Sequence, residues 1–319
     1  MTNKKIIDVA AAVIEREDGA YLLGQRAPDT FYPGYWEFPG GKIEAGESAH
    51  AALVRELHEE LEIEVLRADP WLRREHRYEH GHVRLQFFRV RAWRGECKDH
   101  VHSALTWQRP AAPYVAPMLP ANASVLKALE LPPFYAITHA AELGATHQLA
   151  ALDEALRRGL KLLQLREPDL TPTARADFYA RAVELCRRAD ARVLVNRDAE
   201  LARRVGADGV HLSSAQLAVC TQRPDFPLVA ASCHSPAELE QAARLGCDFT
   251  VYGPVETSAT HPERNGIGWD AFAAQLSVPP APTFALGGLS AQDIDIARRC
   301  GAHGVAAIRS AWSDRAERR

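Results

Sequence analysis

The sequence lacks both a CxxC pair and a close disulfide framework. It has six cysteines in 319 residues, and they stand apart at positions 97, 186, 220, 233, 247 and 300. This spacing favours reduced thiols in a cytosol, where such small side chains fill the core. We therefore expect a cytoplasmic protein.

An excess of basic residues is also lacking, because 38 Lys and Arg face 41 Asp and Glu and the net charge is −3. This excludes a general attraction to nucleic acid polymers or anionic membranes, so any nucleotide substrate is expected to be small. No apolar run approaches membrane-spanning length. The first residues, MTNKKIIDVAAAVIERED, place two lysines before an apolar stretch. Asp8 interrupts that stretch, and its alternation predicts a strand rather than a signal peptide.

Length and composition indicate two soluble globular domains. A chain of 319 residues exceeds one ordinary core, and 47% hydrophobic with 25% charged residues is typical of globular proteins. In the first part, strands such as KIIDVAAAVIE, AYLLGQR and VRLQFFRVRAW accompany one strong helix from Ser48 to about Leu61. The segment LELPPF, residues 129–134, ends this pattern. We place the domains at residues 1–131 and 132–319.

The second part repeats a β-rich run followed by a segment whose sequence predicts a helix. Alternating strands and helices predict an α/β fold with parallel strands and right-handed crossovers, and eight such strands can close into a (β/α)8 TIM barrel with short loops. A doubly wound open sheet is the alternative, which is disfavoured because no GxGxxG motif opens the first unit. The expected strands are FYAIT, KLLQL, RVLVN, GVHL, LVAAS, FTVYG, TFALGG and GVAAI.

The run GGKIEAGESAHAALVRELHEELEI, residues 40–63, concentrates negative charge. Glu56, Glu59 and Glu60 stand at i, i+3 and i+4, so on a helix their carboxylates share one face and repel one another unless a cation neutralises them. Ser48 can cap that helix. Leucines at positions 53, 57 and 61 form the apolar stripe that determines which side is buried.

Hard oxygen ligands without His or Cys select Mg²⁺ or Mn²⁺, and Mg²⁺ shares its shell with waters and phosphate oxygens. The pattern therefore predicts a phosphoanhydride substrate. The paired glycines Gly40 and Gly41 let the backbone pass close to the metal, where the main chain at Gly40 can supply a further ligand. The metal would polarise the phosphoryl group and lower the pKa of an attacking water.

This run resembles the Nudix box, G-x5-E-x7-R-E-U-x-E-E-x-G-U, where U is aliphatic. One position departs, since Glu62 replaces the late glycine. A charged surface helix is the plain alternative, but it does not account for so many matched positions. The positions in register are Gly41, Glu47, Arg55, Glu56, Leu57, Glu59, Glu60 and Ile63.

The resemblance implies a Nudix hydrolase, whose fold is an α/β/α sandwich with a mixed sheet. It implies that Glu56, Glu59 and Glu60 bind the metal and that Glu56 can act as the base. Glu47 and Arg55 would brace one another and the loop.

Residues 5–130, and YWEFPGGKIEAGE most closely, resemble the MutT type of this family. That type hydrolyses 8-oxo-dGTP to 8-oxo-dGMP and pyrophosphate, which clears oxidised nucleotides and supports DNA repair. The resemblance places Arg26 and Phe38 beside the nucleotide, and Asn122 against the base edge. From the residues alone, Arg26 can be a strand-end charge, Phe38 a core residue and Asn122 a helix N-cap.

One departure concerns the metal. The MutT type carries a glutamate in a loop shortly before a tryptophan, and an ungapped match to Trp107 places Val101 there. Valine binds no metal. Asp99, His100 or His102 can replace the missing ligand, or the box glutamates act without it.

Functional groups of (β/α)8 barrels lie at the carboxyl ends of the strands. Two glycines after the seventh strand and backbone amides after the eighth form the usual phosphate cradle of these barrels. The strand ends carry Gln164, Arg166, Asn196, Arg197, Asp198, His211, Ser213, His234, Ser258, Thr260, Gly287, Gly288, Arg309 and Ser310.

The segments QLRE, VLVNRD, ADGVHL, GPVETSAT, ALGGL and GAHGVAAI resemble thiamine phosphate synthase and the related thiazole tautomerase, over about residues 133–313. The resemblance implies that Gln164, Arg166 and Asn196 face a pyrimidine or its pyrophosphate. His234 can be a proton shuttle, or it can be a structural residue whose hydrogen bonds are made within the protein. A thiazole phosphate would be held by Ser258, Thr260, Gly287 and Gly288.

Four positions depart from the synthase pattern. Pro168 and His261 replace lysines, while Arg197 and Gln216 replace the two aspartates that anchor Mg²⁺ and pyrophosphate. Asp198 can compensate only in part. We therefore expect a degenerate barrel that binds a phosphorylated ligand without synthase activity, or one that serves as a sensor or scaffold.

Taken together, the residues predict an Mg²⁺-dependent nucleoside triphosphate hydrolase joined to a thiamine-synthase-like barrel. The alternative keeps both halves in one pathway, with hydrolysis of thiamine-related pyrophosphates and salvage or tautomerisation of thiazole phosphate. Expected partners are small molecules, namely a nucleotide and a thiazole phosphate-like ligand, with no membrane and no nucleic acid polymer.

Overall fold

The computed structural model describes residues 6–79, 81–110, 115–257 and 265–312. The chain divides into two compact units, Met1–Leu131 and Pro132–Arg319. No helix within the described residues has the length and apolar character needed to cross a membrane.

The first unit is built on a mixed four-stranded sheet in the order β4-β1-β6-β5. Strand β1 (Ile6–Ile14) lies parallel to β6 (His82–Arg94) and antiparallel to β4 (Gly40–Lys42). Strand β5 (Glu64–Arg77) pairs antiparallel with β6 at the edge. A smaller antiparallel sheet joins β3 (Trp36–Glu37), β2 (Tyr21–Gln25) and β7 (Ala104–Gln108).

Two helices cover opposite faces of the larger sheet. Because side chains alternate along a strand, Ala12 and Ile14 of β1 join one buried cluster and Val13 joins the other. Helix α1 (Ala49–Leu61) packs on the Ala12 side through its leucine stripe. The short helix η1 (Pro120–Asn122) leads into α2 (Ala123–Leu129), which packs on the Val13 side. This arrangement confirms the expected α/β/α sandwich, and it places Glu56 and Glu60 of α1 beside the edge strand β4.

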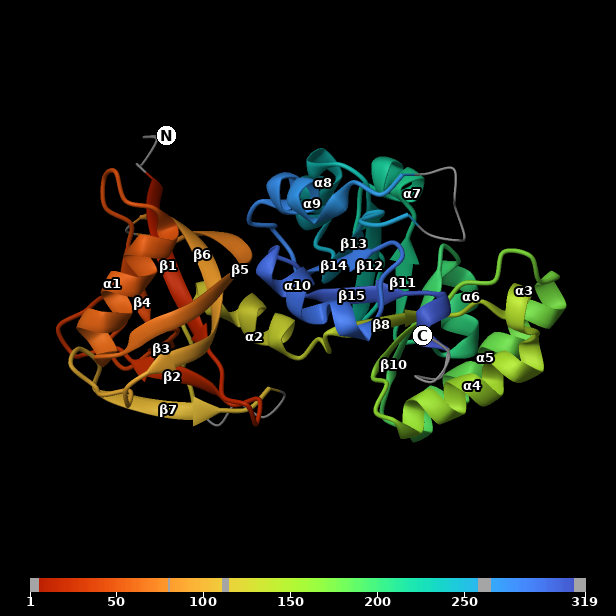
Figure 1. Ribbon diagram of the computed structural model, residues 1–319, viewed down its shortest axis with the longest axis horizontal. Helices are drawn as coiled ribbons and strands as arrows, with labels where there is room; N and C mark the ends of the chain where they lie inside the picture. Colours follow the sequence, from red (N-terminus) through yellow and green to blue (C-terminus); the bar gives the residue numbers. More distant parts are fainter. Residues whose placement is uncertain (1–5, 80, 111–114, 258–264, 313–319) are drawn as a thin grey trace. The chain divides into compact units, whose positions relative to one another are not determined.

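The second unit is a closed barrel of eight parallel strands, as expected. Its strands are β8 (Phe134–Ile137), β9 (Leu162–Leu165), β10 (Arg192–Asn196), β11 (Gly209–Leu212), β12 (Leu228–Cys233), β13 (Phe249–Tyr252), β14 (Thr283–Leu286) and β15 (Gly304–Ala307). The helices between them are α3 (Ala140–Leu143), α4 (Ala145–Arg157), α5 (Pro172–Arg188), α6 (Ala199–Val205), α7 (Ser214–Val219), α8 (Pro236–Leu245), α9 (Gly268–Leu276), η2 (Ala291–Asp293) and α10 (Ile294–Arg299), and η3 (Arg309–Ala311) follows β15. Figure 1 shows them wrapped around the strands.

Side chains fill the barrel interior. The rings of Tyr135, Phe249 and Phe284 lie within 6 Å of one another, with centroid distances of 5.1, 5.2 and 5.8 Å. His211 stacks on Tyr135, and its Nε2 lies 2.9 Å from the Ser232 hydroxyl. Burial lowers the pKa of His211 to about 3. Because the interior is packed, a ligand of this unit must bind at the rim.

A candidate hydrolase site and a charged barrel cavity

The hydrolase site begins at two glycines that bring β4 close to α1. The Gly40 amide donates to Glu60 Oε2 at 3.0 Å. A Cβ on Gly40 would lie 2.1 Å from the Ala10 carbonyl oxygen, and a Cβ on Gly41 would lie 2.2 Å from the carboxylate carbon of Glu56. Side chains at either position would therefore displace the strand pairing or a glutamate.

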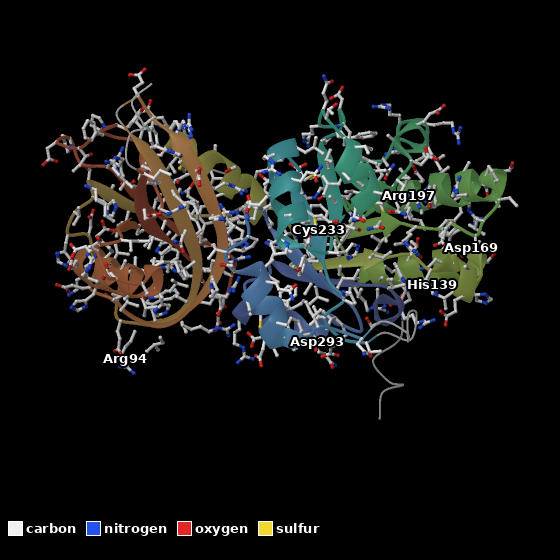
Figure 2. All side chains as sticks on the ribbon, turned by 90° about the horizontal axis from the view of Figure 1, so that it is seen from above. Arg94, His139, Asp169, Arg197, Cys233 and Asp293 are labelled. Carbon is white, nitrogen blue, oxygen red and sulfur yellow. The ribbon has the colours of Figure 1, made fainter. Side chains whose placement is uncertain are left out.

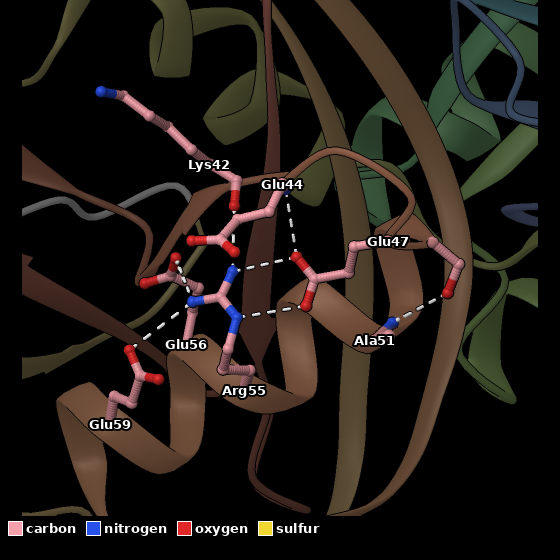
Figure 3. Close-up of polar contacts among 8 residues, drawn as sticks. Lys42, Glu44, Glu47, Ala51, Arg55, Glu56 and Glu59 are labelled. Carbon is pink, nitrogen blue, oxygen red and sulfur yellow. Dashed lines mark hydrogen bonds and ion pairs between the residues drawn. The ribbon is translucent and has the colours of Figure 1, made fainter.

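Arg55 is the centre of the polar contacts on α1 (Figure 3). Its Nε and Nη2 donate to the two carboxylate oxygens of Glu47 at 3.1 and 3.0 Å, and its Nη1 donates to Glu56 Oε1 at 2.8 Å. Nη2 also reaches the Lys42 carbonyl at 3.1 Å, and Nη1 lies 3.5 Å from Glu59 Oε2. These contacts raise the pKa of Arg55, chiefly through Glu47, and fix the direction of the Glu56 carboxylate.

Glu60 differs from Glu56 in its polar partner. Glu56 accepts from the Arg55 guanidinium, whereas among the described contacts Glu60 accepts from the Gly40 amide. Burial raises the pKa of Glu60 to about 8, against the lowering effect of the Gly40 amide, and the charges of Glu56 and Glu37 raise it further. Glu59, by contrast, is 58% exposed. A cation at Glu60 would favour its charged form.

The donor chemistry of this face fits a divalent cation. Within the described ranges, no group of three or more His, Cys, Asp or Glu side chains is already arranged to hold a metal ion. Glu56 is engaged by Arg55, and Glu60 by the Gly40 amide. Mg²⁺ nevertheless suits such a site, because it needs only one or two carboxylates and completes its shell with waters and substrate phosphates.

Arg26 and Phe38 lie near this face in different roles. Arg26 Nη1 lies 2.7 Å from both carboxylate oxygens of Glu37, and its Nε donates to the Phe31 carbonyl at 2.6 Å. Its charge also acts on Glu60. Phe38 is 3% exposed and packs against Tyr21 and Phe87 in the core. The structure thus places Phe38 beneath the site, as a packing residue.

Asn122 presents a buried amide that has no hydrogen-bond partner among the described residues. The residue is 2% exposed and ends η1, yet its side chain makes no capping hydrogen bond to α2 and no hydrogen bond to any other described residue. The N-cap role is therefore excluded. A buried amide that has no protein partner is suited to a ligand that offers both a donor and an acceptor.

The loop after β6 packs on the end of α1 through its backbone. The His100 amide donates to the Glu60 carbonyl at 3.2 Å, and the Lys98 amide donates to the Leu61 carbonyl at 3.0 Å. Val101 is 50% exposed. His102 has only 4% of its side chain exposed, and the charge of Arg26 acts on it. Of the loop residues considered for the missing ligand, His102 lies deepest.

The second unit has a cavity of about 830 Å³ at the ends of β9 to β12. It brings together Arg166, Asn196 and His234 with Asp198 and Ser213. Figure 2 labels Arg197, which also borders this cavity, on the same part of the unit as His139 and Asp169. His234 Nδ1 lies 3.0 Å from the Gly253 carbonyl, so Nδ1 carries the proton and Nε2 remains for a ligand.

Other predicted rim residues lie elsewhere. Gln164 is inside the barrel, where its amide donates to the Tyr135 hydroxyl at 3.2 Å, because its side chain points inward from β9. Arg309 is paired with Glu142 at 2.8 Å. Gly287 and Gly288 have φ values of 115° and 64° and pack against the segment after β13, outside the cavity lining. Ser258, Thr260 and His261 are outside the described residues.

Several cavity residues were missing from the sequence prediction, among them Glu167, Arg175 and Tyr179. Arg175 and Tyr179 belong to α5, and Glu167 follows the strand end by two residues. Helix residues are not found by a search of strand ends. The signal that could have found Arg175 is its place in the first turn of α5, directly after the rim.

Comparison with known proteins now identifies both units. The family described as Thiamine monophosphate synthase matches residues 134–311, and the family described as NUDIX domain matches residues 10–128. The chain is 40% identical to the CTP pyrophosphohydrolase of Escherichia coli over 124 residues, which are 39% of this chain and 91% of the relative. It belongs to the Nudix and thiamine monophosphate synthase families.

Two thiamine-phosphate synthases represent the relatives of the second unit. That of Lysinibacillus sphaericus is 33% identical over 172 residues, which are 51% of this chain and 81% of the relative. That of Synechocystis sp. is 33% identical over 166 residues, which are 51% of this chain, and the match spans 48% of its length. The Nudix unit carries the Arg55 network, and the thiamine monophosphate synthase unit carries the charged cavity.

Proposed function

We propose that the Nudix unit hydrolyses a nucleoside triphosphate to the monophosphate and pyrophosphate, with Mg²⁺ or Mn²⁺ as cofactor. The Arg55 network carries this proposal, because it directs Glu56 toward the glycine-lined approach at Gly41, while Glu60 forms no ion pair with any of the described residues. Glu56, Glu59, Glu60 and the Gly40 main chain would hold the cation.

Each residue of the network has a distinct task. Glu47 holds Arg55 from the loop, and Arg55 holds Glu56, so the Glu56 carboxylate is oriented before a substrate arrives. Glu56 accepts the proton of the attacking water. When bound, the divalent cation supplies Lewis acidity to the phosphoryl group and acidifies water.

We propose 8-oxo-dGTP as the first nucleotide to test, because of Asn122. An amide offers one acceptor and one donor group, and the oxidised guanine offers an N7–H donor beside an O6 acceptor. Ordinary guanine has two acceptors at these positions and fits less well. CTP is the second candidate, since the E. coli relative is a CTP pyrophosphohydrolase and cytosine also offers a donor beside an acceptor.

The test is pyrophosphate release by the full-length protein from 8-oxo-dGTP, dGTP, CTP and thiamine diphosphate, each with Mg²⁺. We expect the highest kcat/KM for 8-oxo-dGTP and a loss of about 100-fold or more in Glu56→Gln. The matched control is Glu62→Gln at the C-cap of the same helix. Glu62 forms ion pairs with Lys98 and His100, which are outside the Arg55 network. Full activity of Glu56→Gln would refute the mechanism, whereas a preference for CTP or thiamine diphosphate would refute the substrate assignment alone.

For the barrel we propose binding of a phosphorylated ligand without synthase turnover. The resemblance assigns the phosphate group to the segment that contains Gly287 and Gly288, and His234 Nε2 is available for a proton transfer of the tautomerase kind. Calorimetry with thiazole phosphate tests this. Binding without turnover supports a sensor, turnover to an isomer supports a tautomerase, and the lack of any heat of binding leaves only a scaffold role.

A further inference from the structure

A series of hydrogen bonds crosses the interior of the barrel and ends at the wall of the cavity. It begins at Gln164, whose amide Nε2 donates to the Tyr135 hydroxyl at 3.2 Å. The same hydroxyl lies 3.2 Å from His211 Nδ1, and His211 Nε2 lies 2.9 Å from the Ser232 hydroxyl. Ser232 borders the cavity. We call these four residues, which come from β9, β8, β11 and β12, the interior network.

Three members of the interior network are fixed by the packing of the barrel. Tyr135, Gln164 and His211 are each at most 3% exposed. The Tyr135 ring is stacked on His211 with the ring centroids 5.9 Å apart, and its other contacts include Phe249 at 5.1 Å. Buried polar atoms have little access to water, so they use one another as partners. The hydrogens of the network therefore have a defined direction.

The direction of the hydrogens follows from the donors at each step. A phenol hydroxyl has one hydrogen, and because Tyr135 accepts from Gln164, its own hydrogen points to His211 Nδ1. Burial and the charge of Arg166 both lower the pKa of His211, so its ring is neutral at pH 7 and carries one hydrogen. Since Nδ1 is the acceptor, that hydrogen is on Nε2 and is donated to the Ser232 oxygen.

We propose that the three interior members of the network are positioning residues that turn the hydroxyl hydrogen of Ser232 toward the cavity. The Ser232 oxygen accepts from His211, and the Ser232 side chain makes no other hydrogen bond to a described residue. Ser232 then donates to an acceptor atom of the ligand, such as a carbonyl oxygen or a ring nitrogen. This donor role rests on the ligand binding proposed above, whereas the direction of the hydrogens does not.

The same direction excludes a second role for this pair. A serine hydroxyl 2.9 Å from an imidazole nitrogen has the spacing of a nucleophile and its base. A base must accept the serine proton, and His211 Nε2 already carries a hydrogen. Ser232 is therefore a hydrogen-bond donor of the cavity wall and not an activated nucleophile.

The first experiment determines which ring nitrogen of His211 carries the hydrogen. Long-range ¹H–¹⁵N correlation spectra are recorded at pH 7 on the full-length protein labelled with ¹⁵N-histidine. The His211 signals are assigned by their loss in His211→Gln. We expect a single tautomer with its hydrogen on Nε2. A hydrogen on Nδ1, or on both nitrogens, would overturn the proposal.

Tyrosine variants test whether the network sets this tautomer. Tyr135→Phe keeps the ring and removes the hydroxyl, so His211 Nδ1 loses its donor and we expect the tautomer with a hydrogen on Nδ1 to appear. The matched control is Tyr252→Phe, because Tyr252 is buried in the same barrel and its hydroxyl donates to Gln275 at 2.6 Å, outside the network. Melting curves report whether each variant is folded. A folded Tyr135→Phe protein that keeps the wild-type tautomer alone would refute the positioning role.

Two measurements address Ser232 itself. A fluorophosphonate, which labels activated serines, should leave Ser232 unmodified, and a label mapped to Ser232 by mass spectrometry would contradict the donor role. In calorimetry with thiazole phosphate, Ser232→Ala should raise the Kd about tenfold, and an unchanged Kd would also contradict it. Absence of binding by the wild-type protein would instead refute the ligand proposed above, since the His211 spectra test the direction of the hydrogens with no ligand present.

Discussion

We predict that Gly41→Ala removes most of the hydrolase activity while the fold remains intact. The added Cβ would lie 2.2 Å from the Glu56 carboxylate carbon and 2.3 and 2.4 Å from its oxygens. Arg55 holds Glu56 Oε1 at 2.8 Å, so the carboxylate cannot turn aside without losing that contact. A displacement of more than about 1 Å is needed to restore ordinary contact distances, and a shift of about 1 Å in a catalytic group already lowers turnover by about 100-fold.

The control for this experiment is Gly19→Ala. Gly19 has φ 80° and a Cβ there meets no atom within 4 Å, whereas Gly41 is not among the glycines with positive φ. Alanine at residue 19 should therefore lower the free energy of unfolding by about 1 kcal/mol and leave activity unchanged. Steady-state pyrophosphate release and thermal melting separate the two effects. The reasoning fails if Gly41→Ala keeps at least half of the wild-type kcat.

Two further predictions concern Asn122 and His211. Asn122→Asp should lower kcat/KM for 8-oxo-dGTP by about tenfold to a hundredfold with a smaller effect on dGTP, and equal losses for both nucleotides would exclude base recognition by this amide. Burial lowers the pKa of His211 from about 6.5 to about 3 in the folded protein. Between these two pH values the histidine is protonated in the unfolded chain and neutral in the folded one. The free energy of unfolding therefore falls as the pH drops from about 6.5 to about 3. The loss reaches roughly 3 kcal/mol at pH 4.5, and urea unfolding between pH 7.5 and 4.5 should show a weaker pH dependence in His211→Gln; the same dependence in both proteins would contradict it.

The fold could be predicted from sequence where local pattern and tertiary structure agree. The helix expected from Ser48 is α1, and all eight barrel strands were recognisable from short apolar runs. Strand β5 was missed, because EVLRADPWLRREHR is rich in charge and contains Pro70. Its edge position explains this sequence, since an edge strand tolerates proline and gains protection from charged residues.

The sites could be predicted only in part. The resemblance to the Nudix box was enough to select Glu47 and Arg55, and the structure joins them by two hydrogen bonds. Whether a polar side chain already has its hydrogen-bond partners depends on its tertiary neighbours. The spacing of residues in the sequence does not show these neighbours. Gln164 is bound to Tyr135 inside the barrel, whereas Arg175 comes from a helix and its buried Nε has no hydrogen-bond partner among the described residues.

The left-handed backbone of Arg197 has a consequence for protein engineering. Glycine, asparagine and aspartate adopt φ near 66° more readily than arginine does, so a search for thermostable variants would replace this residue early. Such a variant would melt at a higher temperature and lose a positive charge at the mouth of the barrel. The strained backbone of Arg197 is therefore a reason to test this residue for a role in binding rather than in stability.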